Sequence, residues 1–194
     1  MPKVVVEYKD QARQRIVDAA QKVFRSKGFR SATMEDIART IGVSKGAIYL
    51  YFPTKMALLS EIQKRSRDQV IESWKRLLDS GDVAEGIADS LEEVFSGDVD
   101  PGVWHELIGE AASDRDLRRA MRTDNREDLA EMARFLGRLE ARGRIRRLRD
   151  RETVAEIILN LLHGAVLGLM LHGRAEESRK ALIRELRYLL EKPP

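Results

Sequence analysis

The chain has 194 residues and no cysteine, and this absence excludes two kinds of site. Without thiols there are neither disulfides nor thiolate-bound metals. The histidines do not replace them, because His163 and His172 are nine residues apart, about 180° around a helix. His105 belongs to a different predicted element. The sequence therefore predicts no metal site and no cofactor.

Long hydrophobic runs are missing as well. Residues 1–7 contain too short an apolar run for a secretory signal. The longest apolar stretch, residues 157–171, is interrupted by Asn160 and His163 and is shorter than the roughly 20 residues that cross a bilayer. We therefore expect a cytoplasmic protein that has no membrane partner.

The chain also has little that catalysis requires. An enzyme needs a nucleophile beside a base, or a cluster of metal ligands. The serines lie mainly at predicted helix caps and loops, and neither cysteine nor a metal-ligand spacing is present. The sequence therefore predicts a protein that is not an enzyme.

Apolar residues make up 43% of the chain and charged residues 35%, which is enough for a core and a well-hydrated surface. The net charge of +3 is distributed unevenly. Residues 1–57 have 11 Lys and Arg against 5 Asp and Glu, whereas the remaining residues have 24 against 27. Such a concentration of positive charge is typical of a DNA-binding head, and a solvated basic face without a partner is the alternative.

Residues 33–52 contain the pattern of two short helices separated by a glycine. Thr33 and Asp36 have the spacing of a capping box, which starts the first helix. Gly42 can adopt the left-handed conformation that ends this helix, and Ser44 can cap the next one. This arrangement is the helix-turn-helix, whose second helix enters the major groove of DNA.

The second helix of this motif has an inward and an outward side. Ile48 and Phe52 form the inward stripe, which leaves the other side free for DNA. Lys45, in the first turn, can donate to guanine acceptors. Gly46 lets the backbone come close, and Tyr49, one turn further on, can stack against a sugar or a methyl group.

The same segment resembles the TetR family of transcriptional regulators over about residues 10–60. The residues that carry the resemblance are Gly28-Phe29, Ala32-Thr33, Ile37-Ala38, Gly42-Val43-Ser44-Lys45-Gly46, Ile48-Tyr49, Tyr51-Phe52 and Lys55-x-x-Leu58. The resemblance implies a dimeric, all-helical repressor whose C-terminal domain binds a small effector and thereby releases an operator.

The resemblance also implies contacts with the phosphates of double-stranded DNA at Tyr51 and Lys55. Tyr51 stands where many members of the family have histidine, which changes the donor of that contact. Thr33 and Ser44, at helix starts, can present hydroxyl and N–H groups to phosphates, or can act only as caps.

No strand pattern, internal repeat or low-complexity tract is found, so the predicted fold class is all-α with nine helices in a two-domain, TetR-like architecture. In addition to the two helices of the motif, helices are expected at about residues 10–27, 54–80, 82–96, 103–112, 114–142, 151–172 and 176–191, with a loop at 97–102. The predicted domains are a DNA-binding head, residues 1–56, and an effector-binding and dimerisation body, residues 57–194.

The last two predicted helices carry the signal for a partner subunit. The helix at residues 151–172 is apolar nearly all round, so it must be buried on most sides. Together with the helix at 176–191, we expect it to form half of a four-helix homodimer interface, as in the family, and a purely internal core is the alternative. The predicted interface residues are Ile157, Leu161, Gly164, Ala165, Gly168, Leu182, Leu186 and Leu189.

An effector site has a weaker signal in the sequence. A pocket between the helices at 54–80 and 151–172 would be lined by Trp74, Phe95, Trp104, Met121, Met132 and Phe135, which at helical spacing are more often plain core. Three polar residues fall within or beside apolar stripes, namely Asn125, Asn160 and His163. A ligand, a backbone carbonyl, a water or, for His163, the partner subunit can satisfy them.

The expected effector is therefore a small hydrophobic molecule. The alternative is a protein of the same fold that binds DNA without an effector, as an architectural factor or under the control of a protein partner. A second basic cluster, at residues 138–151, indicates a solvated turn or a second anionic partner.

Overall fold

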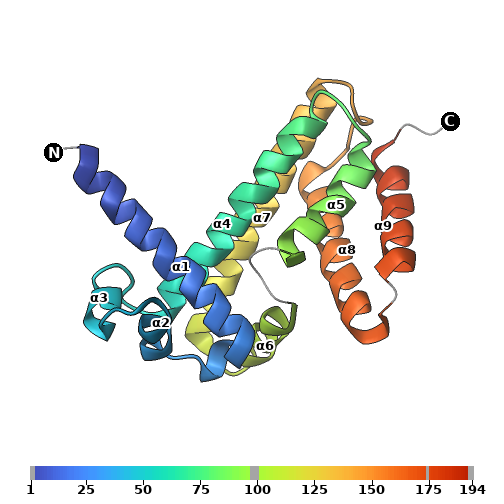
Figure 1. Cartoon of the computed structure of the whole chain (residues 1–194). Helices are drawn as coiled ribbons and strands as arrows, with labels where there is room; N and C mark the ends of the chain where they lie inside the picture. Colours follow the sequence, from blue (N-terminus) through green and yellow to red (C-terminus); the bar gives the residue numbers. More distant parts are fainter. Residues whose placement is uncertain (1–2, 97–100, 174, 192–194) are drawn as a thin grey trace. The chain divides into compact units, whose positions relative to one another are not determined.

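The computed structural model describes residues 3–96, 101–173 and 175–191. Over these ranges the chain forms helices and no strand, which confirms the all-α class (Figure 1). The helices are α1 (Lys3–Ser31), α2 (Met34–Ile41), α3 (Lys45–Tyr49), α4 (Lys55–Leu77), α5 (Val83–Ser96), α6 (Pro101–Ala111), α7 (Arg115–Ala141), α8 (Arg151–His172) and α9 (Ala175–Leu190). Within the described ranges, none of these helices has the length and hydrophobicity needed to cross a membrane.

Most predicted helix starts are confirmed by their caps. The side chain of Thr54 accepts a hydrogen bond from the Ala57 N–H at 3.0 Å, at the start of α4. Asp82 at α5 and Asp114 at α7 accept equivalent bonds, both at 2.9 Å. In the predicted loop at 97–102, residues 97–100 lie outside the described residues, and the other two begin α6.

The first helix differs from its prediction at its start. It begins at Lys3 rather than near residue 10, whereas Gly28 interrupts it at the predicted position. The backbone of Gly28 has φ 76° and ψ 162°, a conformation that only glycine adopts readily. Helical structure then resumes as far as Ser31.

The chain forms two compact units, each with its own core. The first unit comprises residues 1–66 and 98–121, and the second comprises residues 67–97 and 122–194. A segment from the middle of the chain, which includes α6, is therefore part of the unit that contains α1, α2 and α3. The division into domains after residue 56 stays a prediction.

The core of the first unit joins α1 to the predicted motif. Ile37 on α2, Ile48 on α3 and Leu58 on α4 are fully buried, and Phe52 is 1% exposed. Val43, in the turn between α2 and α3, is 38% exposed, so it is not part of this core. A backbone hydrogen bond holds this residue in the turn, since the Val43 N–H donates to the carbonyl of Ala38 at 3.0 Å.

The core of the second unit is built on α7 and α8. Met132, Leu136 and Leu139 recur at helical spacing on α7 and are fully buried, as is Ile158 on α8. Beside them the rings of Trp74 and Phe135 stack, with their centroids 4.9 Å apart.

An arginine connects α4 and α7 inside the second unit. Arg67 forms ion pairs with Asp128 at 2.5 Å, with Asp124 at 3.8 Å and with Glu127. Burial raises the pKa of Asp124 to about 6, although the charge of Arg67 opposes this shift. One cation therefore faces three carboxylates, of which Asp124 is the one most withdrawn from solvent.

The arginines of the second basic cluster support the turn between α7 and α8. Arg146 donates to the carbonyl of Leu189 at 2.8 Å, and Arg144 donates to the carbonyl of Gly81. Arg151 pairs with Glu140 at 2.7 Å. These contacts favour the interpretation of this cluster as a solvated turn.

Candidate nucleic-acid interface

The start of α2 has the predicted capping box. The Asp36 N–H donates to Oγ1 of Thr33 at 3.1 Å, and the Thr33 N–H donates back to the Asp36 carboxylate at 3.1 Å. Two N–H groups that a helix start leaves without partners are satisfied in this way. The prediction that Thr33 caps this helix is confirmed.

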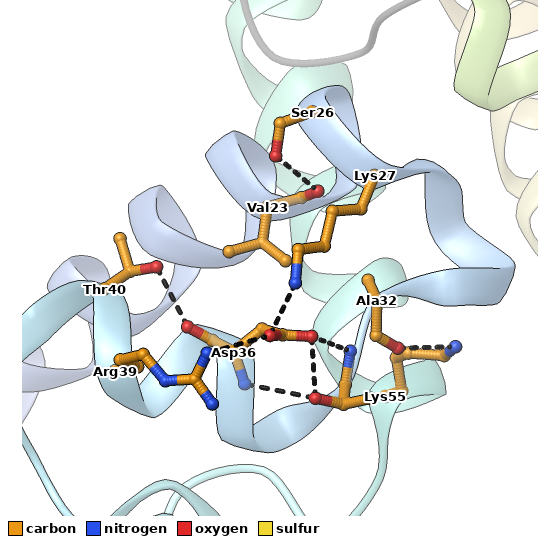
Figure 2. A network of polar contacts seen from close by, with 9 residues as sticks. Val23, Ser26, Lys27, Ala32, Asp36, Arg39, Thr40 and Lys55 are labelled. Atoms are coloured by element: carbon orange, nitrogen blue, oxygen red, sulfur yellow. Dashed lines mark hydrogen bonds and ion pairs between the residues drawn. The ribbon is translucent and has the colours of Figure 1, made fainter.

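Asp36 is also the centre of a polar network that connects α1 and α2 (Figure 2). Its carboxylate forms an ion pair of 2.6 Å with Lys27 on α1 and a longer one, 3.7 Å, with Arg39 on α2. Hydrogen bonds from Lys27 and Thr33 lower the pKa of Asp36 to about 2. The carboxylate therefore stays charged at all physiological pH values and holds the first turn of α2 against α1.

The turn between α2 and α3 has the geometry expected from the sequence. Gly42 is left-handed, with φ 71° and ψ 33°, and ends α2. Ser44 then caps α3, since its side chain accepts a bond from the Ala47 N–H at 3.2 Å. Both elements of the predicted helix-turn-helix are thus present, and α3 has five residues.

The outward side of α3 presents the residues predicted to read bases. Lys45 is exposed and Tyr49 is 43% exposed, and the Lys45 ammonium lies 5.9 Å from the centre of the Tyr49 ring. A β-carbon at Gly46 would meet only the Ser44 hydroxyl, at 3.9 Å, so this part of the surface is open. Leu50, which follows Tyr49, is 85% exposed. Sequence reasoning missed Leu50, although its position off the Ile48 stripe is a signal for it.

Tyr51 and Lys55 are placed differently from the outward residues. Tyr51 is half-buried and packs against the core of the first unit. The ammonium of Lys55 donates to three backbone carbonyls, those of Phe29 at 2.6 Å, Ala32 at 3.0 Å and Arg30 at 3.1 Å. Burial lowers the pKa of Lys55. Phosphate contacts at Tyr51 and Lys55 stay predictions, and Lys55 would have to exchange an internal bond to make one.

A carboxylate on α6 contacts the same stretch of backbone. Glu106 accepts hydrogen bonds from the N–H groups of Phe29 and Arg30, both at 2.8 Å. Sequence reasoning missed this residue. Phe29 and Glu106 are 77 positions apart, so no local pattern connects them.

Another arginine supports the end of the motif. Arg13 on α1 pairs with Glu61 on α4 at 2.6 Å, and its guanidinium lies 4.4 Å from the centre of the Phe52 ring. These contacts hold Phe52, the residue that closes the motif.

The residues of the predicted effector pocket are distributed over both units. Trp74, Met132 and Phe135 belong to the core of the second unit, whereas Trp104 and Met121 belong to the first. The side chain of Phe95 lies outside the described part of the structure. The hollow beside Trp74 and Phe135 has a volume of about 10 Å³, room for no more than one water.

The polar candidates for that pocket are placed nearer to solvent. Asn125 and Asn160 are exposed in the single chain, and His163 is half-buried. Burial lowers the pKa of His163, and the charge of Asp128 partly offsets this. An effector contact at any of these residues stays a prediction.

The predicted dimer residues fall on two different sides of their helices. On α8, Ile157 is 40% exposed and Gly164 is exposed, whereas Leu161, Ala165 and Gly168 are half-buried. On α9, Leu182 and Leu186 are buried in the core of their own unit, and Leu189 is half-buried. An exposed stripe follows one face of α8 and consists of Thr153, Ile157, Asn160, Gly164, Leu167 and Leu171.

Comparisons with known proteins agree with this geometry. Residues 16–62 match the family model described as bacterial regulatory proteins, tetR family. The HTH-type transcriptional regulator CymR of Pseudomonas putida is 30% identical over 186 residues, which cover 91% of this chain and 86% of CymR. The HTH-type transcriptional repressor BepR of Brucella suis is 30% identical over 178 residues, which cover 84% of this chain and 82% of BepR.

A solved structure has the same fold. The transcriptional regulator FadR from Bacillus subtilis, in complex with stearoyl-CoA, superposes with a TM-score of 0.65 at 22% identity and covers 91% of this chain and 97% of its own. The helix-turn-helix geometry and the two relatives that match nearly the whole length lead to one conclusion. The chain belongs to the TetR family and is a DNA-binding transcriptional regulator.

Proposed function

We propose that the protein is a repressor that binds a palindromic operator as a homodimer and is released by a small hydrophobic effector. The observation that carries the proposal is the outward side of α3, where Lys45 and Tyr49 are exposed while Ile48 is fully buried. The helix is capped at its start and anchored from within, so its free side is available for the major groove.

The contacts with DNA follow from this placement. Lys45 donates to guanine O6 or N7 from the first turn of α3, and the open space at Gly46 admits the edge of a base or its methyl group. Tyr49 and Leu50 cover the adjacent sugar or thymine methyl. The hydroxyl groups of Ser44 and Thr33 both accept cap bonds. The Thr33 hydroxyl also donates to the Asp36 carboxylate at 2.8 Å, so it would have to exchange that bond to donate to a phosphate.

The exposed apolar stripe on α8 supports the homodimer. Ile157, Leu167 and Leu171 are 40%, 41% and 67% exposed in the single chain, and Gly164 between them allows a partner helix to come close. A two-fold axis at this stripe buries the same residues on both subunits. A dimer of this kind presents two α3 helices to half-sites about 34 Å apart, which is why the operator is expected to be palindromic.

Support for an effector comes from the similarity to FadR, whose solved structure contains stearoyl-CoA. The stack of Trp74 and Phe135 is the apolar region of the second unit where an effector of that type would enter. Because the hollow beside this stack has a volume of only about 10 Å³, such a ligand has to separate the two rings. The small volume is the observation that favours the second candidate, a DNA-binding factor that responds to no effector.

The DNA-binding part is tested by selecting duplexes from a random-sequence pool with the wild-type protein, in the presence of excess nonspecific competitor. A palindromic consensus is expected, and Tyr49→Ala should weaken binding to it by about 1–3 kcal/mol per half-site. Tyr188→Ala is the matched control, since Tyr188 is 82% exposed and lies in the other unit. Unchanged binding by Tyr49→Ala, or a pool without a consensus, would refute the assignment of α3 to the groove.

The effector part is tested on a variant with one tryptophan. The chain has only Trp74 and Trp104, so Trp104→Phe makes Trp74 the only indole reporter. Titration with stearoyl-CoA should change its fluorescence and should release the selected duplex over the same concentration range, because the two binding events are linked. Fluorescence and DNA affinity that both stay constant with stearoyl-CoA and with shorter acyl-CoAs would favour the effector-free factor.

A further inference from the structure

The backbone between the break in α1 and the start of α2 is held by two side chains of opposite charge. The carboxylate of Glu106 on α6 accepts from the N–H groups of Phe29 and Arg30, both at 2.8 Å. The ammonium of Lys55 on α4 donates to the carbonyls of Phe29, Arg30 and Ala32. All these residues belong to the first unit.

The break at Gly28 explains why charged groups are needed here. Its extended ψ of 162° interrupts the helical ladder, so the next N–H groups lack the carbonyls that would otherwise accept from them. The last carbonyls before α2 likewise have no partner in their own helix. Glu106 accepts from the N–H groups, and Lys55 donates to the carbonyls. Hydrogen bonds to charged groups are stronger than those between neutral groups.

The close approach of Glu106 depends on the residue at the break. A β-carbon added to Gly28 would lie 2.6 Å from Oε2 of Glu106. Glycine therefore allows both the backbone conformation and the space that the carboxylate occupies. Figure 1 shows the helix that carries this carboxylate, α6, beside the end of α1, and contacts join the two helices.

This stretch of backbone leads directly into the DNA-binding motif. Ala32 is 2% exposed, and the next residue, Thr33, is the cap that starts α2. The position of that cap is fixed from one side by Lys27 through Asp36, and from the other by the backbone that Glu106 holds. A change in the position of Glu106 therefore acts on the first turn of α2.

We propose that Glu106 is a positioning residue for DNA binding, through which α6 sets the start of α2. The inference rests on the proposed function, since α2 and α3 act together as the reading head. It gives α6, which comes from residues 101–111 in the middle of the chain, a direct connection to the motif. Glu106 itself touches no DNA in this proposal.

The experiment compares Glu106→Gln with Glu110→Gln. Glutamine keeps the shape of the side chain but replaces one acceptor oxygen with an NH₂ donor, so the two N–H bonds cannot both persist. Glu110 lies one turn further along α6, and among the described residues its Oε2 has no hydrogen-bond partner. Both carboxylates raise the pKa of Lys55. The control therefore removes a nearby charge without removing the two bonds.

Amide hydrogen exchange is the first measurement, because it needs no DNA. In Glu106→Gln the N–H groups of Phe29 and Arg30 should exchange about ten- to a hundredfold faster, and the first turn of α2 should follow. The amides of α1 from Val17 to Ala20 should keep their protection, which a general loss of stability would not allow. Unchanged exchange at Phe29 and Arg30, or an equal increase throughout α1, would overturn the proposal.

DNA binding is the second measurement, with the duplex that the wild-type protein selects. Glu106→Gln should bind it about tenfold more weakly at a temperature far below unfolding, with an unchanged salt dependence, because no phosphate contact is lost. Glu110→Gln should bind like the wild type. Faster exchange with wild-type binding would show a structural bond only and would reject the positioning role.

Glu106→Asp keeps these tests informative if the glutamine variant fails to fold. Aspartate retains the charge on a side chain one methylene shorter. Its exchange rates and DNA affinity should therefore lie between those of the wild type and those expected for Glu106→Gln. Wild-type values for both in Glu106→Asp would overturn the proposal. If no duplex is selected at all, the proposed function fails, whereas the exchange data still report on the contact of Glu106.

Discussion

Oε2 of Glu106 lies only 2.6 Å from the position that a β-carbon on Gly28 would occupy. Gly28 also has φ 76° and ψ 162°, a region of backbone conformation that is essentially restricted to glycine. Two independent constraints, one steric and one conformational, therefore apply to the same residue. Both are local to the segment that joins α1 to the DNA-binding motif.

Gly28→Ala should lower the free energy of unfolding of the protein by at least about 2 kcal/mol, because it adds backbone strain and displaces the Glu106 carboxylate from its two hydrogen bonds. The matched control is Gly143→Ala. Gly143 has φ 66° and nothing within 4 Å of its added β-carbon, so strain of about 1 kcal/mol is expected there. Urea denaturation measures both, and equal losses would contradict the steric contribution of Glu106.

Asp36 should make the head sensitive to acid. Its pKa in the folded chain is about 2, against an ordinary value of 3.8, so the unfolded chain binds this proton more readily. The contribution of Asp36 to stability is therefore complete above pH 3.8 and is lost as the pH falls through 2. A carboxyl-detected NMR titration should give the depressed pKa, and Lys27→Met should raise it. A wild-type midpoint near 3.8 would show that the ion pair with Lys27 is absent in solution.

The parts of the site that sequence analysis predicted are those defined by short spacings. The caps at Thr33 and Ser44 and the left-handed Gly42 each depend on residues within three or four positions, so their geometry follows from the chain itself. The buried stripe of the motif is local in the same sense. These features are sufficient for the helix-turn-helix and for the family.

The contacts between distant segments could not be predicted in this way. Glu106 was missed because its partners are 77 and 76 positions away, and nothing in α6 by itself indicates them. The core sides of α9 were also ambiguous, since Leu182 and Leu186 suit an internal core as well as a dimer interface. The structure places both in the core of their own unit. Periodicity shows that a face is apolar but does not show what covers it.

Lys55→Gln should lower the free energy of unfolding by about 1–3 kcal/mol, because a neutral amide cannot replace an ammonium that donates to three carbonyls. Lys45→Gln should leave stability unchanged, since Lys45 is exposed. Salt titrations of DNA binding add the second readout. A slope of log Kd against log salt that falls by about one per subunit in Lys55→Gln would mean that this ammonium also neutralises a phosphate. Unchanged stability would contradict the internal role.

Asp124→Asn should stabilise the protein at pH 7.5 by about 1 kcal/mol and have little effect at pH 4. The pKa of Asp124 is about 6 in the folded chain and ordinarily 3.8, so the folded chain holds the proton more tightly. Stability therefore falls as the pH rises from about 4 through 6, and asparagine removes that loss. Asp128→Asn is the control, because it breaks the 2.5 Å pair with Arg67 and should destabilise. Destabilisation by Asp124→Asn at pH 7.5 would show that the pair with Arg67 outweighs the burial of the carboxylate.

Ile157→Arg should convert the proposed homodimer into monomers that remain folded. Ile157 is 40% exposed on the stripe of α8, so an arginine is tolerated in the free chain, whereas Leu161 packs against the core and would disturb it. In a two-fold interface the substitution acts twice, and losing two buried isoleucines costs roughly 3 kcal/mol or more.

Sedimentation velocity at micromolar concentration measures the outcome, together with circular dichroism for the fold. Gln69→Arg is the control, since it adds the same charge at an exposed position of α4 in the same unit. Operator affinity should fall with the dimer, because a monomer reads one half-site only. An Ile157→Arg protein that sediments as a dimer and keeps its operator affinity would move the interface away from this stripe, and with it the spacing of the two α3 helices.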